Sequence, residues 1–273
     1  MYNDRIDDAV NENQSTRRRQ VPAVSRAVAI LRYLGKSDEP AGVSQVAREL
    51  GLVPSTCLHI LRVLADEGLV AFDPHSKRYA VGIGILPIAR NAIQRNGFAN
   101  LIEPRLTELS LDFGGTAVAT QLAEPGHMVV VALSQAPLAF RLHVDLGSRF
   151  PALISATGRC HAAFNLRGVP EDELRSRFEA LTWDHPPAFE RWMREVDQTR
   201  RQGYAVDPGC YISGVTLLSV PFFDRAGRMT HSIVAIGITE KLEAMGIASI
   251  AARMRRLRDD VSALLVDGQH PVA

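Results

Sequence analysis

Four polar side chains near residue 55 have the spacing of neighbours on one face of a helix. Ser55, His59 and Arg62 are three or four positions apart, and Thr56 lies beside Ser55. Residues at that spacing share a helix face. Small hydroxyls near a helix start, followed by a long cation, can hydrogen-bond phosphates and base edges in a DNA groove. These four residues are therefore candidate contacts to nucleic acid.

The helix that must position them is predicted over residues 54–67. Pro54 suits its first turn, where the missing N–H is not needed, and we include Pro54 among the candidate DNA contacts. The opposite face is apolar and is expected to pack against neighbouring helices. Its apolar positions are Leu58, Leu61, Leu64 and Ala65.

Two shorter helices are predicted to precede this one. Apolar residues follow helical spacing from Val24 to Leu34. Ser44 is expected to cap a second helix over 45–50, which ends at Gly51, and Ser44 is a further candidate DNA contact. The tight connection between the second and third helices is typical of a helix-turn-helix.

A hairpin is predicted after the third helix, with two short strands around the turn from Asp73 to Ser76. Lys77 and Arg78 lie at its tip, where a wing can contact the DNA backbone or the minor groove. The order helix, helix, turn, helix, hairpin predicts a winged helix-turn-helix domain over residues 21–83.

The distribution of charge supports nucleic-acid binding by the front of the chain. Residues 15–95 contain twelve Lys and Arg but six Asp and Glu, although the whole chain has a net charge of only +1. A basic module on a near-neutral body is the electrostatic pattern expected of DNA binding. Residues 1–20, which include Arg17–Arg19, are expected to form a disordered arm. The alternative is a winged helix used only for protein contacts.

The composition of the 273 residues excludes several other classes of protein. Cys57, Cys160 and Cys210 are far apart and show no CxxC or disulfide spacing, which favours the reducing cytoplasm. The first residues lack the apolar core of a secretory signal. No apolar run reaches about 18 residues, so no membrane span is expected.

The rest of the chain predicts a helical linker over 84–114, interrupted near Asn96-Gly97 and again before Pro104. It also predicts an α+β domain with a largely antiparallel sheet over 115–267. Strand patterns precede and follow a block of three helices. A final helix is predicted over about 244–266, and its narrow apolar seam is expected to pack on the domain's own sheet, with a dimer contact as the alternative.

Catalysis and metal binding are poorly supported in this second domain. Cys160 and His161 are adjacent, but neighbours on a helix point in different directions and no third orienting group is evident. The histidines show no metal-ligand spacing. We expect no enzyme, no metal and no cofactor, and we keep an enzyme on the rear domain as an alternative. A small-molecule pocket is the better interpretation, since the segment SATGRC offers small residues and a helix start that suits a carboxylate.

Two long segments make the chain resemble a known family. The segment from Ala23 to Leu86 resembles the N-terminal domain of the isocitrate lyase regulator (IclR) family of bacterial transcription factors. The segments LGSRFPALISATGRCHAAF and RRQGYAVDPGCYISGVTLLSVPFFDRAGRMTHSIVAIGI are similar to that family's effector domain. The resemblance implies a winged helix, a dimerising linker helix, a GAF-like effector-binding domain, and dimers or pairs of dimers on palindromic operators.

Matching motifs also imply which residues contact a small-molecule effector. They are Ala156, Thr157, Asp207, Leu217, Val234 and Ile236. The sequence departs from the family pattern at Arg159-Cys160 and at 208–211, and Val234 and Ile236 stand where small hydroxyls can occur. These exchanges remove hydrogen-bonding groups, so an aromatic or other hydrophobic carboxylate is expected as the effector.

Overall fold

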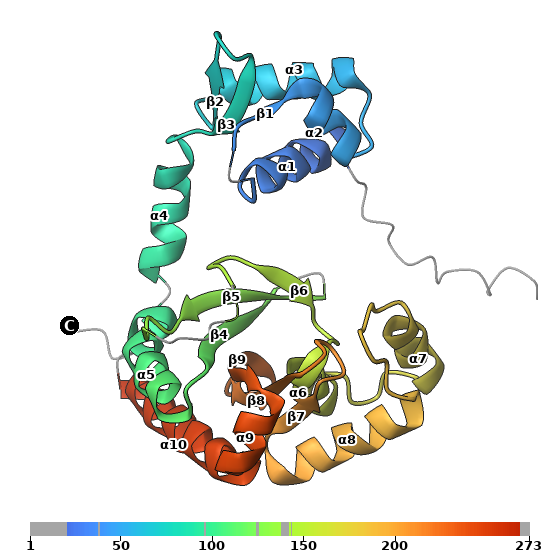
Figure 1. Cartoon of the computed structure of the whole chain (residues 1–273), viewed down its shortest axis with the longest axis vertical. Helices are drawn as coiled ribbons and strands as arrows, with labels where there is room; N and C mark the ends of the chain where they lie inside the picture. The colour runs from blue at the N-terminus through green and yellow to red at the C-terminus, as the bar shows by residue number, and fades with distance from the viewer. Residues whose placement is uncertain are drawn as a thin grey trace, which may run out of the picture. The chain divides into compact units, whose positions relative to one another are not determined.

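The computed structural model describes residues 21–267, apart from residues 38, 96, 124, 125, 138–141 and 143 (Figure 1). The predicted arm over 1–20 lies outside the described residues. The chain divides into two compact units, Met1–Arg95 and Asn96–Ala273. None of the described helices is both long and apolar enough to cross a membrane.

The first unit is a small helical domain with a three-stranded sheet. Its sheet has the order β1-β3-β2, and both pairings are antiparallel. The helices are α1 (Pro22–Leu34), α2 (Val43–Glu49), α3 (Pro54–Asp66) and α4 (Ile85–Arg95). The strands are β1 (Ala41–Gly42), β2 (Val70–Asp73) and β3 (Arg78–Val81).

The three predicted helices pack around one core. Ile30 of α1, Val46 of α2 and Leu61 of α3 are all fully buried and belong to the same cluster. Removing such side chains from water at ~25 cal/mol per Å² is the main stabilisation of so small a domain. The predicted hairpin is present, and the short strand β1, which no sequence pattern indicated, extends its sheet.

The predicted role of Ser44 as a helix cap is wrong. Helix α2 begins one residue earlier, at Val43, and Gly42 is the capping residue, with no side-chain hydrogen bond. Pairing of Gly42 with Arg78 in the sheet holds the chain extended up to that point, so the helix begins directly after the strand. Ser44 is an exposed residue of the first turn.

The second unit is built on a six-stranded antiparallel sheet of order β6-β5-β4-β9-β8-β7. The strands are β4 (Thr116–Ala123), β5 (His127–Leu133), β6 (Arg149–Pro151), β7 (Ala205–Pro208), β8 (Val215–Phe223) and β9 (Met229–Ile238). The helices are α5 (Gly97–Phe113), α6 (Ser155–Asn165), α7 (Glu171–Glu179), α8 (Phe189–Gln202), α9 (Thr239–Met245) and α10 (Ile247–Asp267).

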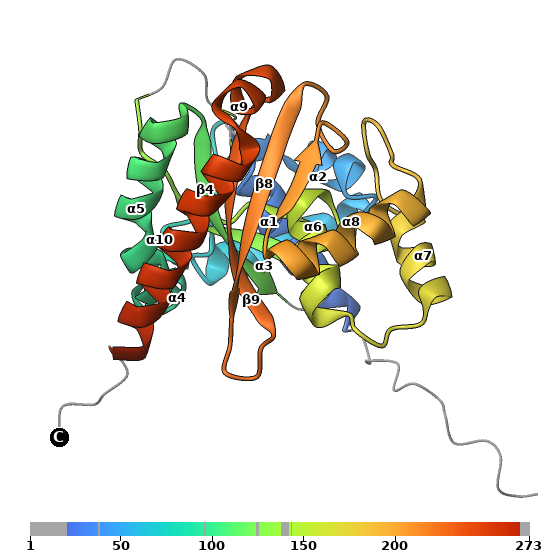
Figure 2. The same cartoon turned by 90° about the horizontal axis from the view of Figure 1, so that it is seen from below.

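Helices cover both faces of this sheet (Figure 2). Alternation along the strands decides which face each side chain occupies. Ala117, Leu218 and Ala235 pack with α5 and α10 in one cluster, whereas their neighbours Val118 and Leu217 pack with α6 in another. The resulting α+β architecture confirms the predicted fold class.

The segment predicted as one linker over 84–114 belongs to two units. Its predicted interruption near Asn96-Gly97 is confirmed, whereas the interruption predicted before Pro104 is wrong, because Pro104 lies inside α5. Helix α4 ends the first unit at Arg95, and α5 belongs to the second unit. Phe98, Ile102 and Leu106 of α5 are buried in the core of the second unit. Long-range packing of this amphipathic helix, which a local sequence pattern does not contain, is the reason for the difference.

The predicted final helix is confirmed as α10, and the short helix α9 before it is one that the sequence analysis did not predict. Helix α9 ends at Met245, and α10 begins at Ile247. Gly246 between them has φ 84°, a left-handed conformation that glycine adopts readily and that ends a helix. The apolar seam of α10 packs on its own sheet, as expected, since Ile250, Met254 and Val261 are buried there.

A buried histidine, His161, and a half-buried one, His231, predict how the stability of the second unit depends on pH. Burial lowers the pKa of His161 and of His231 to about 4, from 6.5. Because the unfolded chain then takes up protons first, their stabilising effect is present above pH 6.5. It is lost as the pH falls from 6.5 towards 4, by about 1–3 kcal/mol for each histidine.

Urea unfolding at pH 7.0, 5.5 and 4.5 measures this loss. His231 stacks on Phe98 with ring centroids 4.2 Å apart, so His231→Phe should keep the packing while removing the titrating group. The variant is expected to lose less stability than the wild type between pH 6.5 and 4.5. Parallel pH profiles for the two proteins would contradict the prediction.

Candidate functional site

Helix α3 presents its polar stripe to solvent. Ser55, His59 and Arg62 are exposed, and Thr56 is half-buried beside them. Pro54 is the first residue of the helix and is also exposed. The structure therefore brings the predicted polar residues together on one free face.

The opposite side of α3 is held in the domain core. Leu61 and Leu64 are buried as predicted, and Cys57 is buried completely. Leu58 and Ala65 are only half-buried, so the buried face is turned slightly from the predicted one. A helix anchored in this way can present its outer face to a groove without losing its packing.

The hairpin tip is held by Asp73. Its carboxylate accepts hydrogen bonds from the backbone N–H of His75 (2.9 Å) and from the Ser76 hydroxyl (2.5 Å). The Ser76 hydroxyl contributes most to keeping the pKa of Asp73 below its usual value, and the His75 N–H adds to this effect. These bonds close the turn on which the predicted wing cations lie.

The two wing cations have different surroundings. Lys77 is exposed and has φ 55°, a left-handed conformation that completes the turn. Arg78 is also exposed, but its Nη1 donates to the carbonyl oxygen of Pro40 at 2.8 Å. Part of the Arg78 guanidinium is thus used to hold the segment before β1, whereas Lys77 projects from the tip.

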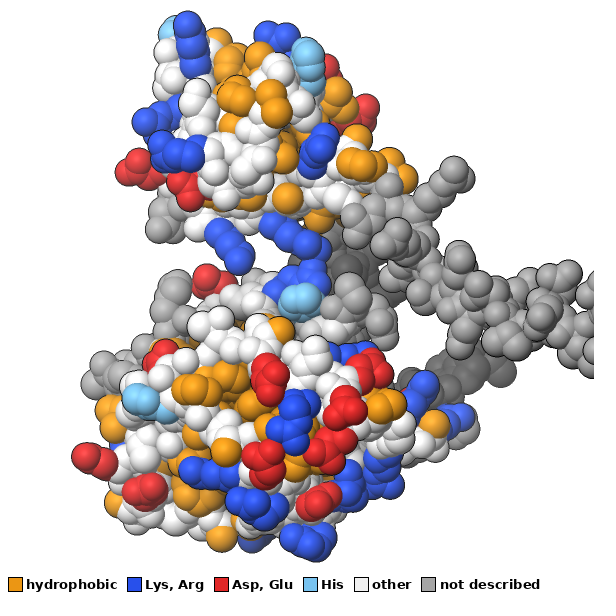
Figure 3. Space-filling model, turned by 90° about the vertical axis from the view of Figure 1, so that its right-hand side faces the viewer, with side chains coloured by type: hydrophobic (Ala, Val, Ile, Leu, Met, Phe, Trp, Pro, Cys, Tyr) orange, Lys and Arg blue, Asp and Glu red, His pale blue; other side chains and the backbone are white. Residues whose placement is uncertain are grey.

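The visible face of the second unit carries basic and acidic side chains interspersed (Figure 3). Arg175 pairs with both Glu171 and Glu190, and Arg191 pairs with Glu195. Local pairing cancels the field of these arginines. These paired side chains of α7 and α8 therefore contribute little unbalanced positive charge to attract a phosphate backbone.

The second unit encloses a cavity of about 280 Å³ between its sheet, the start of α6 and the segment after β7. Four residues predicted to contact an effector line it, namely Thr157, Leu217, Val234 and Ile236. The other lining residues are Val118, Val130, Leu142, Val144, Ser148, Arg149, Phe150, Ser155, Tyr211 and Ile212. The lining is mainly apolar with a few polar groups, which is the usual character of a small-molecule site.

The other two predicted effector residues do not line this cavity. The side chain of Ala156 is fully buried in the core between α6 and the sheet. Asp207 is fully buried, and its Oδ1 accepts hydrogen bonds from the backbone N–H groups of Cys210 (2.7 Å) and Tyr211 (3.3 Å). The hydrogen bonds of the Asp207 carboxylate therefore hold the turn that follows β7.

Arg159 is the counter-ion of Asp207. Its guanidinium is fully buried, and Nη1 lies 3.4 Å from Asp207 Oδ2 and donates to the Ser155 carbonyl at 2.9 Å. Its Nε donates to Glu195 of α8 at 2.7 Å. Arg159 thus joins α6, α8 and the turn after β7, and it lies outside the cavity lining.

Most of the missed lining residues belong to strands or loops that only the folded chain brings to the cavity. Val118 and Val130 alternate inward on strands that the sequence predicts, but alternation does not show where the sheet leaves a space. Tyr211 did carry a clue, because it lies in the segment that departs from the family pattern. Ser148 and Arg149 lie in the segment LGSRFPALISATGRCHAAF, which resembles the family's effector domain, but neither residue by itself indicated a contact to the cavity.

The polar end of the cavity is the start of α6. Helix α6 begins at Ser155, and its capping residue Ile154 makes no side-chain hydrogen bond to the first turn. The first N–H groups of a helix have no partner within the helix and favour an anion. Thr157 Oγ1 is buried without a hydrogen-bond partner among the described residues. The N–H of Thr157 already donates to the Ser155 hydroxyl at 3.4 Å. Within the described part of the chain, the groups left to receive a carboxylate are the N–H groups of Ser155 and Ala156 and the Thr157 hydroxyl.

The cysteines of the second unit are poorly suited to chemistry. Burial raises the pKa of Cys160 to about 12, and burial likewise raises the pKa of Cys210. A thiol is nucleophilic and binds metals as the thiolate, so both groups are inert near neutral pH. Within the described parts of the chain, no group of His, Cys, Asp and Glu residues could hold a metal ion.

Two known protein families match this chain, one in each unit. Residues 23–74 match the family described as the IclR helix-turn-helix domain. Residues 90–263 match the family described as the bacterial transcriptional regulator IclR C-terminal domain. The chain belongs to the IclR family of bacterial transcriptional regulators.

Relatives in the IclR family align over almost the whole chain. The HTH-type transcriptional repressor AllR of Escherichia coli strain K12 is 25% identical over 257 residues, which is 91% of this chain and 92% of AllR. The crystal structure of an IclR transcriptional regulator from Alicyclobacillus acidocaldarius has a TM-score of 0.76 at 25% identity, covering 89% of this chain and 98% of that one. The Thermotoga maritima IclR structure shares the fold, with a TM-score of 0.64 at 20% identity, covering 90% and 99% of the two chains.

These comparisons establish the general function. The chain is an IclR-family transcriptional regulator with a helix-turn-helix DNA-binding domain and a C-terminal effector domain. Its relatives regulate transcription and are not enzymes, so the alternative of an enzyme on the rear domain is not supported.

Proposed function

We propose that the protein binds a palindromic operator through α3 and the wing, and that an organic carboxylate in the second unit modulates this binding. The exposed stripe of Ser55, His59 and Arg62, on a helix whose back is buried, carries the proposal. Further contacts to the operator come from the starts of α2 and α3, at Ser44, Pro54 and Thr56. The wing contacts the DNA backbone through Lys77 and Arg78. The protein would act in the cytoplasm, where bacterial DNA lies.

The operator would be bound by a homodimer, alone or as a dimer of dimers. The first unit leaves large apolar side chains exposed beyond the wing, with Ile83 82%, Leu86 61% and Ile88 67% accessible. A second copy of this chain that covered them would gain hydrophobic stabilisation in proportion to the area buried. Two α3 helices related by a two-fold axis would then read half-sites one helical turn apart or a multiple of it.

The effector would place its carboxylate at the start of α6 and its apolar body against the sheet. The unpartnered Thr157 hydroxyl and the first N–H groups of α6 supply donors, and Arg149 adds positive charge to the lining. Val118, Leu217 and Ile236 offer only apolar surface. This composition supports an aromatic or other hydrophobic carboxylate rather than a small, highly polar acid.

Operator binding is tested on the DNA that flanks the protein's own gene, at two salt concentrations and with random competitor DNA. Binding that weakens with salt but survives competitor is expected, because phosphate contacts release counterions and base contacts supply specificity. Binding indifferent to salt would support a winged helix used for protein contacts. Binding abolished by competitor would leave only a basic surface.

Thr157→Val predicts opposite effects on stability and on effector binding. The Thr157 hydroxyl is buried and has no hydrogen-bond partner among the residues that the structure describes, and such a group costs about 1–3 kcal/mol. Its removal should leave the free protein equally stable or raise its melting temperature. A hydrophobic carboxylate such as 4-phenylbutanoate should then bind about tenfold more weakly, because one hydrogen bond to a charged group is lost.

Calorimetric titration and thermal melting measure the two effects. Thr107→Val is the control for ligand binding, because Thr107 also lies on a helix but outside the cavity. Its melting temperature should fall, since the Thr107 hydroxyl accepts from the N–H of Gln135 at 3.0 Å. If Thr157→Val binds the acid as tightly as the wild type, the carboxylate does not use this hydroxyl.

A further inference from the structure

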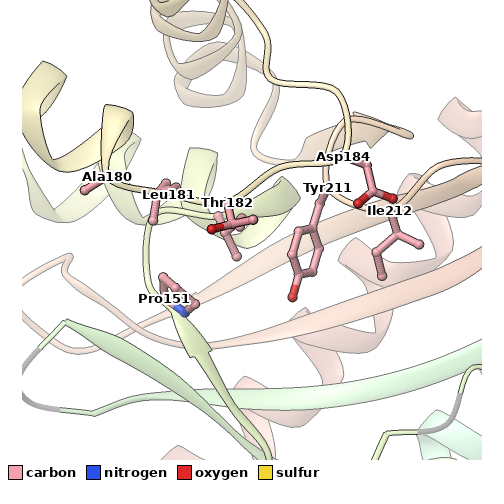
Figure 4. Close-up of a pocket in the computed structure, with 8 residues that line it drawn as sticks. Pro151, Ala180, Leu181, Thr182, Asp184, Tyr211 and Ile212 are labelled. Atoms are coloured by element: carbon pink, nitrogen blue, oxygen red, sulfur yellow. The ribbon is translucent and has the colours of Figure 1, made fainter.

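A second cavity adjoins the first one and shares part of its wall. It has a volume of about 490 Å³ and is open to solvent on one side. Its lining residues are Pro151, Ile154, Ala180, Leu181, Thr182, Asp184, Tyr211 and Ile212 (Figure 4). Tyr211 and Ile212 line both cavities, so these two side chains form the partition between them.

The backbone of the partition is fixed. The N–H of Tyr211 donates to Asp207 Oδ1 at 3.3 Å, and the carbonyl of Tyr211 accepts from the N–H of Asp184 at 3.4 Å. Asp207 is in turn held by the buried Arg159. The position of the partition is therefore set by the core of the second unit.

The side chain of Tyr211 is less restrained than its backbone. Its hydroxyl makes no hydrogen bond within the described parts of the chain, and the ring is half-buried between the two cavities. Figure 4 shows the ring extending from its loop towards the side on which Pro151 lies. Rotation of such a ring about its side-chain bonds can join the two spaces without moving the backbone.

The second cavity has a chemical character of its own. Pro151, Ile154 and Leu181 provide apolar walls, while Thr182 and Asp184 provide oxygen atoms at the solvent side. Asp184 Oδ2 accepts from the Ser213 N–H at 2.8 Å, which orients the carboxylate and holds the pKa of Asp184 below its usual value. An ionised, oriented carboxylate is suited to a ligand group that donates hydrogen bonds, and Figure 4 shows the Thr182 side chain apart from it, with Tyr211 between the two.

The size of the first cavity also points to a longer ligand. Pockets for small molecules usually measure roughly 300–1,000 Å³, and 280 Å³ lies at the lower limit of that range. The two cavities together lie well within it. A compound that filled only the first one would leave the open, partly polar space beside Tyr211 to water.

We propose that the two cavities form one divided site, which binds an elongated carboxylate with a hydroxyl or amino group on the part that passes Tyr211. The apolar body and the carboxylate occupy the first cavity, and the donor reaches the Asp184 carboxylate in the second. This inference rests on the carboxylate effector proposed above and adds the length and the second polar group of that effector.

Calorimetric titration with three unbranched acids tests the proposal on the full-length protein. The probes are octanoate, dodecanoate and 12-hydroxydodecanoate. Dodecanoate should bind at least about tenfold more tightly than octanoate, since each buried methylene adds up to about fourfold. The terminal hydroxyl should add about a further five- to tenfold through its hydrogen bond to a charged acceptor.

Two variants assign these gains to the second cavity. Ala180→Trp fills it from an exposed position that does not line the first cavity, and should bring 12-hydroxydodecanoate to the affinity of octanoate while octanoate is unaffected. Thr182→Val combined with Asp184→Asn keeps an acceptor for Ser213 and should abolish the advantage of the hydroxyl. Asp172→Asn, an exposed change on α7 outside both cavities, is the control.

The outcomes separate this inference from the effector proposal. Octanoate, dodecanoate and 12-hydroxydodecanoate binding with equal affinity, sensitive to Thr157→Val, would overturn the divided site and retain the carboxylate effector. Gains with length that persist in Ala180→Trp would also overturn it. Failure of all three acids and of 4-phenylbutanoate to bind folded protein would overturn both proposals.

Discussion

Replacing Arg159 with methionine is expected to lower the free energy of unfolding of the second unit by about 3–5 kcal/mol. Asp207 is fully buried, and Arg159 is the cation that faces it, with Nη1 and Oδ2 3.4 Å apart. Methionine fills much of the same space but leaves the carboxylate without a counter-ion in an apolar surrounding. It also removes the bond that joins α6 to Glu195 of α8.

Urea unfolding followed by tryptophan fluorescence measures this loss. The two tryptophans of the chain, Trp183 and Trp192, both lie in the second unit, so the signal reports on that unit alone. Arg175→Met is the matched control. Like Arg159, Arg175 pairs with two carboxylates, but it does so at the surface, where such pairs contribute about 0–1 kcal/mol.

A double variant distinguishes lost pairing from lost packing. Arg159→Met combined with Asp207→Asn removes both charges, and the asparagine oxygen can still accept from the N–H groups of Cys210 and Tyr211. The double variant should recover part of the stability lost in Arg159→Met. A single variant no less stable than Arg175→Met, or a double variant that recovers nothing, would contradict an ion pair that positions this turn.

Replacing Arg62 with alanine should weaken binding to the protein's own operator by about 1–3 kcal/mol if the guanidinium reads a base. Arg62 is exposed on α3 and makes no ion pair within the described residues, so its five donors are free to contact DNA. A bidentate contact to guanine would be lost on the specific site only. Affinity for random DNA should change much less.

Titration of operator and random DNA over a range of salt concentrations measures the loss of affinity for the specific site and the loss of affinity for random DNA. Arg32→Ala is the control, because Arg32 is an exposed arginine of the same unit that lies on α1. Equal weakening on every sequence, with a salt slope reduced by about one, would make Arg62 a phosphate contact. An operator affinity that Arg62→Ala leaves unchanged would show that α3 does not recognise bases through Arg62.

Local rules determined much of the first unit. The stripe on α3, its apolar back, and the hairpin turn closed by Asp73 depend on residues within a few positions of one another. Helical spacing and turn chemistry act over that distance, so the sequence alone predicts them. Ser44 was the exception, because the pairing of Gly42 with Arg78 decides where α2 begins.

The ligand cavity depended on the tertiary structure. The resemblance to the family implied Leu217, Val234 and Ile236 as effector contacts, but no local pattern showed that a space remains between them and α6. Asp207, which the resemblance placed in the site, is instead held by an arginine 48 positions away in the chain. Tyr211 borders two cavities for the same reason, since Asp207 positions its backbone.

The distance along the chain over which an interaction acts decides whether the sequence alone predicts a feature or only the tertiary structure shows it. Helix faces and turns are set by backbone geometry and neighbouring side chains, and these are written in short segments of sequence. Cavities and buried ion pairs are set by which distant segments pack together and by what the packing leaves unfilled or unpaired. The sequence therefore determined the helix proposed to meet DNA, and only the folded chain decided where a ligand has room to bind.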